Sequence, residues 1–388
     1  MKIVIAPDSF KESLSAADVA RHIVAGFKCI YPDADYVALP MADGGEGTVD
    51  ALVTATGGRL VHATVTGPQS APIAAFFGLI DRDRTAVIEI AAACGLAAVP
   101  PRRRNPLTTT TRGCGELILA ALDQGCRHLI LGLGGSATND GGAGMLQALG
   151  ARLCDTDGTS IGPGGGALAR LAHIDLSGLD PRLQACRIDV ACDVDNPLLG
   201  PDGASAVFGP QKGATPEQVA ILDRNLAHYA ALIERDQGLD VRTLPGGGAA
   251  GGMGAALSAL LGARLRPGID IVIEAAGLDS ALLDADLLIT GEGRIDGQTV
   301  RGKTPCGVAR AARRHRVPVV AIAGCLARDA GLVHEHGIDS VFSVLYRPCA
   351  LTEALSEAAD NLLLTARNIA ALHRLAWRAS TRPPRADA

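Results

Sequence analysis

The fold class follows from the opening of the chain, MKIVIAPDSFKESLSAADVARHIVAGFKCIYPDADYVALP (residues 1–40). Short apolar runs alternate there with stretches of helical apolar spacing, the first of them after a capping serine. We expect strands at 2–6 and 36–39, and helices at 16–30, after Ser15, and at 47–56. This βαβα rhythm is typical of a mainly parallel sheet with helices on both faces.

The end of the chain resumes this rhythm. There we expect strands at 285–290, 317–323 and 340–344 and helices at 305–315 and 351–377. The middle holds glycine loops, β-type segments and alanine-rich helices instead. We therefore predict an α/β protein in which residues 1–58 and 284–388 pair into one parallel-sheet domain and a second α/β domain, 59–283, is inserted between them. The final RPPRADA is expected to be a frayed end.

Composition restricts the class of partner. The 388 residues carry a net charge of −5 with interspersed signs, which provides no basic surface for nucleic acid. No apolar run approaches the roughly 18 residues of a membrane span, and the apolar start is too short for a signal peptide. Ten cysteines without a C-x-x-C pair argue against a zinc ribbon or a disulfide framework. We expect a cytoplasmic monomer or homodimer that acts on a small molecule, without a nucleic-acid or membrane partner.

Charged residues follow three of the predicted strands. In an open parallel sheet, ligands bind beyond the carboxyl ends of the strands, where loops and helix N-termini converge. Taken singly, each such residue could be a helix cap or solvated surface. Coincidence at three strand ends favours one polar site, made of Asp8, Ser9 and Lys11 after the first strand, Asp43 after the second, and Glu292, Arg294 and Asp296 after the strand at 285–290.

The predicted inserted domain holds a glycine-rich loop after an apolar strand at 128–133. Small residues let backbone amides surround an oxyanion, while hydroxyl and amide side chains add donors. The alternative is a tight turn that packs a helix on a strand. The loop residues expected to bind phosphate are Gly134, Gly135, Ser136, Ala137, Thr138 and Asn139. Two further polar loops hold Asp193, a candidate base, and Lys212, a candidate phosphate cation.

Two formal motifs support other functions. Residues 297–304, GQTVRGKT, match the P-loop pattern, but GEGRID separates them from the predicted strand, so only Lys303 is kept as a possible anion contact. Gly246, Gly248 and Gly251 match a dinucleotide fingerprint of a dehydrogenase, but Pro245 closes the preceding segment. A non-catalytic sensor of small molecules is a third possibility, for which no helix-turn-helix or basic patch provides an output.

The motifs together resemble the bacterial glycerate kinase family that forms 2-phosphoglycerate. The resemblance covers nearly the whole chain and rests on APDSFKESLSA, ADGGEGT, LGLGGSATNDGG, VFGPQKGA, GEGRIDGQT and GK-x-P. It implies an ATP-dependent kinase of D-glycerate with a flavodoxin-like domain, an inserted α/β domain and an active site in the cleft between them. Three positions depart from the family pattern: Cys94 and Cys114 stand where Ser or Thr is expected, and Gly247 is an extra glycine. Phosphorylation of the 3-hydroxyl, or of another small hydroxy acid, is the alternative.

A hypothesis for the site residues follows from this resemblance and from the demands of phosphoryl transfer, which are in-line placement and neutralisation of charge. The glycine loop would hold the ATP phosphates, and Asp43 or Glu292 would hold Mg²⁺. Lys11 and Lys212 would offset the charge of the transition state. The glycerate would be bound with the help of Asp8, Ser9 and Arg294, and its hydroxyl proton would pass to Asp193 or Asp296.

Overall fold

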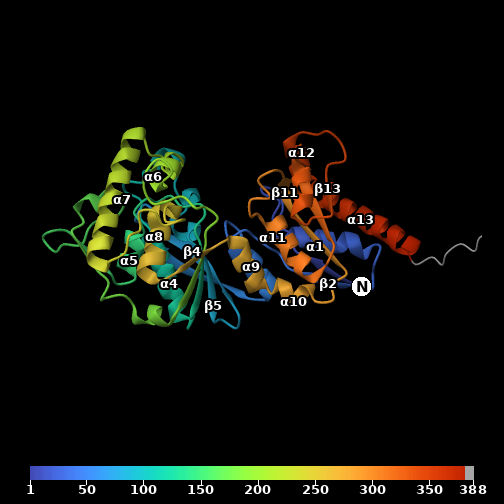
Figure 1. Cartoon of the computed structure of the whole chain (residues 1–388), viewed down its shortest axis with the longest axis horizontal. Coiled ribbons are helices and arrows are strands. Elements are labelled where there is room, and N and C mark those ends of the chain that lie inside the picture. Colours follow the sequence, from blue (N-terminus) through green and yellow to red (C-terminus); the bar gives the residue numbers. More distant parts are fainter. Residues whose placement is uncertain (381–388) are drawn as a thin grey trace, which may run out of the picture. The chain divides into compact units, whose positions relative to one another are not determined.

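The computed structural model describes residues 1–380, which form two compact units. One unit combines Met1–Asp43 with Val272 and the residues after it, and the other is Gly44–Ile271. Figure 1 shows the chain coloured along its sequence. Residues 381–388, which include the whole predicted frayed end, lie outside the described part of the chain. In the described part, none of the helices is both long and apolar enough to cross a membrane.

The first unit is built on a five-stranded parallel sheet in the order β13-β12-β11-β1-β2. Counted within this unit, the order is 2-1-3-4-5, which is that of flavodoxin. The predicted flavodoxin-like domain is therefore confirmed. The strands are β1 Lys2–Ile5, β2 Asp35–Ala38, β11 Leu287–Ile295, β12 Val319–Leu326 and β13 Ser340–Ser343.

Helices cover this sheet. The predicted cap is confirmed, because the side chain of Ser15 accepts the N–H of Asp18 at 3.1 Å. The apolar face of α1 packs against α13, and both lie over Ile3 and Ile5 (Figure 1). Val4 points to the opposite face of the sheet and is also fully buried. The helices are α1 Ala16–Lys28, α10 Leu278–Leu282, α11 Thr304–His315, α12 Leu351–Ser356, α13 Ala358–Ser380 and the 3-10 helix η6 Ala330–His336. Helix α9, Gly268–Ala276, begins in the second unit and ends in the first.

The second unit has a six-stranded mixed sheet in the order β10-β9-β6-β5-β4-β3. The pairs β3–β4 and β4–β5 are antiparallel, and the remaining pairs are parallel. A separate antiparallel pair is formed by β7 and β8. The strands are β3 Arg59–Thr66, β4 Pro72–Ile80, β5 Thr85–Glu89, β6 His128–Gly132, β7 Arg152–Cys154, β8 His173–Asp175, β9 Arg187–Ala191 and β10 Arg264–Arg266.

Helices surround a large apolar core in this unit, to which β5, β6, α4, α7 and α8 contribute. The α-helices are α2 Thr48–Thr56, α3 Ala91–Cys94, α4 Arg112–Asp123, α5 Ala143–Ala148, α6 Ala204–Phe208, α7 Pro216–Gln237 and α8 Ala249–Leu261. The 3-10 helices are η1 Leu96–Ala98, η2 Pro101–Arg103, η3 Ala167–Arg170, η4 Pro181–Ala185 and η5 Pro210–Lys212.

The borders of the units differ from those expected from the sequence. The first lies at 43/44 rather than 58/59, and the second at 271/272 rather than 283/284. The first border moves because α2 belongs to the second unit. The backbone N–H of Val49 in α2 donates to Glu89 of β5 at 2.8 Å, and Gly78 of β4 leaves room for Val49 and Val53. The second moves because α10 packs on α11 of the first unit.

Candidate active-site groups

The carboxyl ends of β1 and β11 hold the polar groups of the first unit. The strand order reverses between these two strands, and ligands bind at such a switch point in open α/β sheets. Asp8 follows β1, and its N–H continues the ladder by donating to Gly291 of β11 at 2.8 Å. Glu292 lies on β11 itself, because this strand runs to Ile295. The expectation that the strand ends at Thr290, before Glu292 and Arg294, is therefore wrong.

Asp8 is held by hydrogen bonds to both carboxylate oxygens. Thr304 Oγ1 donates to Oδ2 at 2.6 Å, and the N–H of Ser9 donates to Oδ1 at 2.6 Å. Burial raises the pKa of Asp8, and the charge of Asp43 raises it further, while the hydrogen bond from Thr304 acts in the opposite direction. Asp8 and Asp43 are therefore close enough to repel one another. A cation or a substrate hydroxyl placed between them would relieve that repulsion.

Glu292 is the second buried carboxylate of this group, at 8% exposure. Thr299 Oγ1 donates to Oε1 at 2.5 Å, and Lys303 Nζ lies 3.6 Å from Oε2. Burial raises its pKa to about 7, aided by the charges of Asp8 and Asp296 and opposed by Thr299 and Lys303. The carboxyl therefore titrates near neutral pH, in the range where acid–base groups of enzymes work.

Replacing Glu292 with Gln should change how stability depends on pH. The folded pKa of about 7 exceeds the ordinary 4.5, so the folded chain binds the proton more tightly than the unfolded chain. The stabilising contribution is complete below about pH 4.5 and is lost as pH rises through 7. Across that window the free energy of unfolding of the wild type should fall by about 3 kcal/mol relative to Glu292→Gln. Urea unfolding at a series of pH values measures this, and parallel curves for the two proteins would contradict it.

The other predicted residues of the first unit are more exposed. Lys11 is exposed in the loop after β1. This loop passes close to β11, because a Cβ on Gly293 would lie 3.3 Å from the backbone nitrogen of Lys11. Arg294 is 65% exposed, and its Nε lies 3.3 Å from Asp296 Oδ2. Asp296 Oδ1 also accepts the N–H of Gln298 at 2.9 Å, so this carboxylate shapes the turn after β11. Ser9, Lys11 and Asp296 thus belong to the two loops at this switch point, and Arg294 lies near the end of β11.

The P-loop match lies in a different context from the one expected. Because β11 ends at Ile295, residues 297–304 directly follow a strand and lead into α11. The sequence argument that six residues separate strand and motif is therefore wrong. Lys303, immediately before α11, faces the Glu292 carboxylate, so its ammonium belongs to the same polar group as Asp8 and Glu292.

The glycine loop of the second unit lies directly after β6, as predicted. Gly134 and Gly135 are exposed, and Ser136–Asn139 is buried. Within the described residues, the N–H groups of Gly134, Gly135 and Ser136 have no backbone acceptor. Two buried side-chain atoms of the loop, Thr138 Oγ1 and Asn139 Oδ1, also have no hydrogen-bond partner in that part of the chain. The loop therefore presents unused donors at the carboxyl end of a strand, as an oxyanion site requires.

Asp140, directly after this loop, is its main anchor, and sequence reasoning gave it no role. It is buried and accepts the N–H and the Oγ1–H of Thr111, both at 2.9 Å. It also accepts the N–H groups of Gly142 at 3.2 Å and Gly144 at 3.3 Å. Burial raises its pKa, and the donors from Thr111 and the two glycines lower it. The only signal in the sequence was an Asp between a glycine loop and two further glycines.

Lys212 supports the loop from its buried side. The residue is 2% exposed, and its ammonium donates to the carbonyl of Thr138 at 2.7 Å. Burial lowers its pKa to about 8, while the nearby Cys94 and Asp140 act in the opposite direction. In this structure Lys212 thus contacts the loop backbone beneath the anion-facing side. Cys94, where Ser or Thr was expected, is fully buried beneath the same loop, with its carbonyl accepting the N–H of Ala137.

Gly251, the last glycine of the dinucleotide match, packs against the loop. No strand precedes Gly246 in the stretch from Leu239 to Pro245. Gly251 has φ +69°, and a Cβ there would lie 2.1 Å from the carbonyl oxygen of Thr138. Its own carbonyl accepts the N–H of Gly141 at 2.9 Å. Only glycine permits this contact, which fixes the loop from a second side.

Asp193 follows β9, as predicted from the apolar strand before it. It is exposed, and its Oδ1 accepts the N–H of Gly268 at 2.9 Å, at the first residue of α9. The carboxylate therefore interacts favourably with the positive end of that helix. This holds the side chain in place at the carboxyl end of the strand.

The carboxylates of the first unit suit a magnesium ion that arrives with a nucleotide. Among residues 1–380, no group of three or more His, Cys, Asp or Glu side chains is placed to hold a metal ion by itself. Mg²⁺ commonly uses one or two carboxylates together with substrate phosphates and water. Asp8 and Asp43 provide such oxygens. A bound dication would offset the repulsion between their negative charges. Glu292 is less available, since the Lys303 ammonium already lies 3.6 Å from its Oε2.

Comparisons with known proteins agree along almost the full chain. The model of the Glycerate kinase family matches residues 3–374. The chain is 59% identical over 376 residues to a glycerate kinase of Bacillus subtilis (strain 168), covering 97% of this chain and 98% of that protein. It is 58% identical over 371 residues to a glycerate 2-kinase of Escherichia coli (strain K12), covering 96% and 97%.

A solved structure shows the same fold. The crystal structure of a Salmonella typhimurium LT2 protein described as glycerate kinase 2 superposes with a TM-score of 0.89 at 59% sequence identity. The match covers 97% of this chain and 99% of that one.

Proposed function

This chain belongs to the glycerate kinase family, and from that membership we propose that it transfers the γ-phosphoryl group of ATP to the 2-hydroxyl of D-glycerate, giving 2-phosphoglycerate and ADP. The observation that carries the choice of hydroxyl is the near full-length similarity to a glycerate 2-kinase. The hydroxyl oxygen forms the new bond to phosphorus, the bond to the ADP oxygen breaks, and the hydroxyl proton passes to a carboxylate.

The phosphates of ATP are assigned to the glycine loop of the second unit. Its exposed amides at Gly134 and Gly135 would donate to phosphate oxygens, and Ser136, Ala137, Thr138 and Asn139 complete the loop. Asp140 and Lys212 hold this loop in shape. Such pre-organisation lowers the cost of stabilising charge in the transition state.

Glycerate is assigned to the polar group of the first unit. Arg294 and Ser9 would bind its carboxylate, and Asp8 would accept a hydrogen bond from a hydroxyl. Asp193 or Asp296 would take the proton from the 2-hydroxyl, and Lys11 would offset charge on the transferring phosphoryl group. The two groups belong to different units of the chain.

Asp43, with Asp8 or Glu292, would hold Mg²⁺, which supplies charge neutralisation to the phosphates when bound. The described cysteines support a reducing compartment, because all ten are free thiols. We therefore place the kinase in the cytoplasm. Its small-molecule partners in this proposal are ATP and D-glycerate.

An enolase-coupled assay distinguishes the two possible products. Enolase converts 2-phosphoglycerate into phosphoenolpyruvate directly, but it needs phosphoglycerate mutase to use 3-phosphoglycerate. With ATP, Mg²⁺ and D-glycerate, we expect phosphoenolpyruvate from this protein and enolase alone. A signal that appears only after addition of the mutase would assign the 3-hydroxyl. Reduction of NAD⁺ in the absence of ATP would instead indicate a dehydrogenase.

Lys11→Ala should lower kcat/KM for glycerate at least tenfold, a change of about 1.4 kcal/mol in transition-state stabilisation. Lys11 is exposed, so its removal should leave the free energy of unfolding unchanged within about 0.5 kcal/mol. Lys28→Ala, also an exposed lysine of the first unit, is the matched control and should keep wild-type kinetics. Equal kcat/KM in both variants would remove Lys11 from the proposed site.

A further inference from the structure

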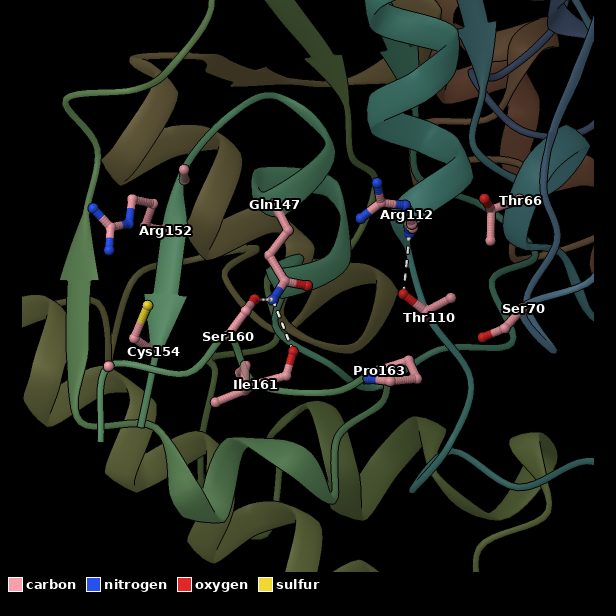
Figure 2. Close-up of a pocket in the computed structure, with 12 residues that line it drawn as sticks. Thr66, Ser70, Thr110, Arg112, Gln147, Arg152, Cys154, Ser160, Ile161 and Pro163 are labelled. Atoms are coloured by element: carbon pink, nitrogen blue, oxygen red, sulfur yellow. Dashed lines mark hydrogen bonds between the residues drawn. The ribbon is translucent and has the colours of Figure 1, made fainter. Parts of the chain in front are cut away.

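A second site is suggested by a cavity of about 730 Å³ in the second unit. Figure 2 shows its walls, with Arg112 at the start of α4 on one side, Arg152 of β7 on the other, and Gln147 and Ser160 between them. All of its lining residues belong to the second unit, and none of them lies in the glycine loop 134–139. Its volume lies within the range of sites for small molecules.

The charge of the lining is positive. Two arginines line the cavity, and none of its lining residues is an Asp or Glu. Glu116 is an acid beside Arg112, but its oxygens accept the N–H of Thr66 at 2.6 Å, the hydroxyl of Thr66 at 2.9 Å and only Nε of Arg112 at 3.2 Å. In the described residues, the two terminal nitrogens of Arg112 donate no hydrogen bond within the protein, so they are available to a ligand.

Arg152 is similarly available. It is exposed on β7, and its neighbour across the ladder is Asp175 of β8. That carboxylate accepts the N–H of Ser177 at 2.9 Å. Asp175 interacts electrostatically with Arg152. Among residues 1–380, however, the Arg152 guanidinium donates no hydrogen bond, so its fork keeps the capacity to bind a planar anion.

Hydroxyl groups and a helix end complete the lining. Thr66, Ser70, Thr110 and Ser160 contribute hydroxyls. The cavity also contains the first residue of α4, a helix of twelve residues whose positive end favours negative charge. Gln147 is fixed in place, since its Nε2 donates to Ser160 Oγ at 3.1 Å and to the carbonyl of Ile161 at 3.0 Å (Figure 2).

We propose that this cavity binds a small organic polyanion with hydroxyl groups, a hydroxy polycarboxylate or a phosphate ester, whose negative groups are bound by Arg112 and Arg152. Either ligand would use the same chemistry, in which guanidinium forks bind the anionic groups and threonine and serine hydroxyls bind the uncharged oxygens. This site is separate from the proposed catalytic groups and holds its ligand without turnover.

The test is calorimetric titration of the full-length protein, without ATP, with L-malate and with inorganic phosphate as probes. We expect binding of at least one probe that weakens tenfold or more in Arg112→Gln and in Arg152→Gln. Stronger binding of malate would indicate a carboxylate ligand, and stronger binding of phosphate a phosphate ester. Arg59→Gln is the matched control, because Arg59 is also an exposed arginine of this unit that pairs with a carboxylate, Asp83.

Residual binding at the proposed catalytic groups does not confuse this test, because the two cavity variants leave those groups intact. All three variants should keep the thermal unfolding midpoint of the wild type, since each replaces a half-exposed or exposed side chain. Identical isotherms for the wild type and both cavity variants would overturn the proposal. The absence of measurable binding of either probe at millimolar concentration would do the same.

Discussion

Asp140→Asn is expected to lower kcat/KM for ATP at least about a hundredfold and the free energy of unfolding by about 3 kcal/mol. The carboxylate accepts four donors, two from Thr111 and one each from Gly142 and Gly144. An asparagine offers one acceptor oxygen and an NH₂ group, which would face N–H donors already present. Buried donors would lose their acceptor, and the loop before Asp140 would shift relative to the nucleotide.

Steady-state kinetics and urea unfolding measure the two effects. Asp175→Asn replaces an exposed Asp of the same unit. It should leave kcat/KM unchanged and should change the free energy of unfolding by no more than about 0.5 kcal/mol. Thr111→Val removes only one hydroxyl donor and should give a smaller loss in both measurements. An Asp140→Asn protein with wild-type stability and kinetics would show that the loop does not depend on this anchor.

Lys212→Met should separate activity from stability. The ammonium donates to the Thr138 carbonyl, so its loss should lower kcat/KM about a hundredfold by releasing the phosphate loop. Burying it as a cation is costly, however, as its lowered pKa of about 8 indicates. At pH 7 the methionine variant should therefore be at least as stable as the wild type, because an apolar side chain of similar length avoids that desolvation.

The stability difference between the wild type and Lys212→Met should depend on pH. Between about pH 8 and 10.5 the unfolded chain keeps the Lys212 proton while the folded chain loses it, so the wild type gains stability relative to the variant as pH rises. The gain should amount to about 3 kcal/mol. Lys28→Met, at an exposed site, should show no such trend. A stability difference between wild type and Lys212→Met that is constant from pH 7 to 10.5 would contradict a buried, charged Lys212.

The sequence predicted the fold better than it predicted the limits of elements. Alternating strands and helices gave the parallel sheet, but β11 was expected to stop at Thr290 because GEGRI has no apolar run. Its extension comes from pairing with β12, where Glu292 lies opposite Ala323 and Arg294 opposite Cys325. Likewise, the periodicity of α2 showed a helix but not the sheet on which it packs. Both misses come from contacts between residues distant in sequence.

For the candidate residues, too, the position at a strand end could be predicted from the sequence, whereas burial and contacts could not. Strand ends correctly indicated Asp8 and the glycine loop as groups at the carboxyl edges of two sheets. Burial is not visible in a single sequence, so nothing indicated that Asp140 would anchor the loop or that Glu292 would titrate near 7. The sequence also did not indicate that the Lys212 ammonium, a candidate phosphate cation, would donate to the Thr138 carbonyl.

A crystal structure of the protein with a non-hydrolysable ATP analogue, Mg²⁺ and D-glycerate would test the central assignment most directly. We predict β- and γ-phosphate oxygens at about 3 Å from the amide nitrogens of Gly134 and Gly135. The carboxylate of glycerate should contact Arg294 or Ser9. Triphosphate density at residues 297–304 of the first unit, with the Gly134–Asn139 loop empty, would contradict the assignment.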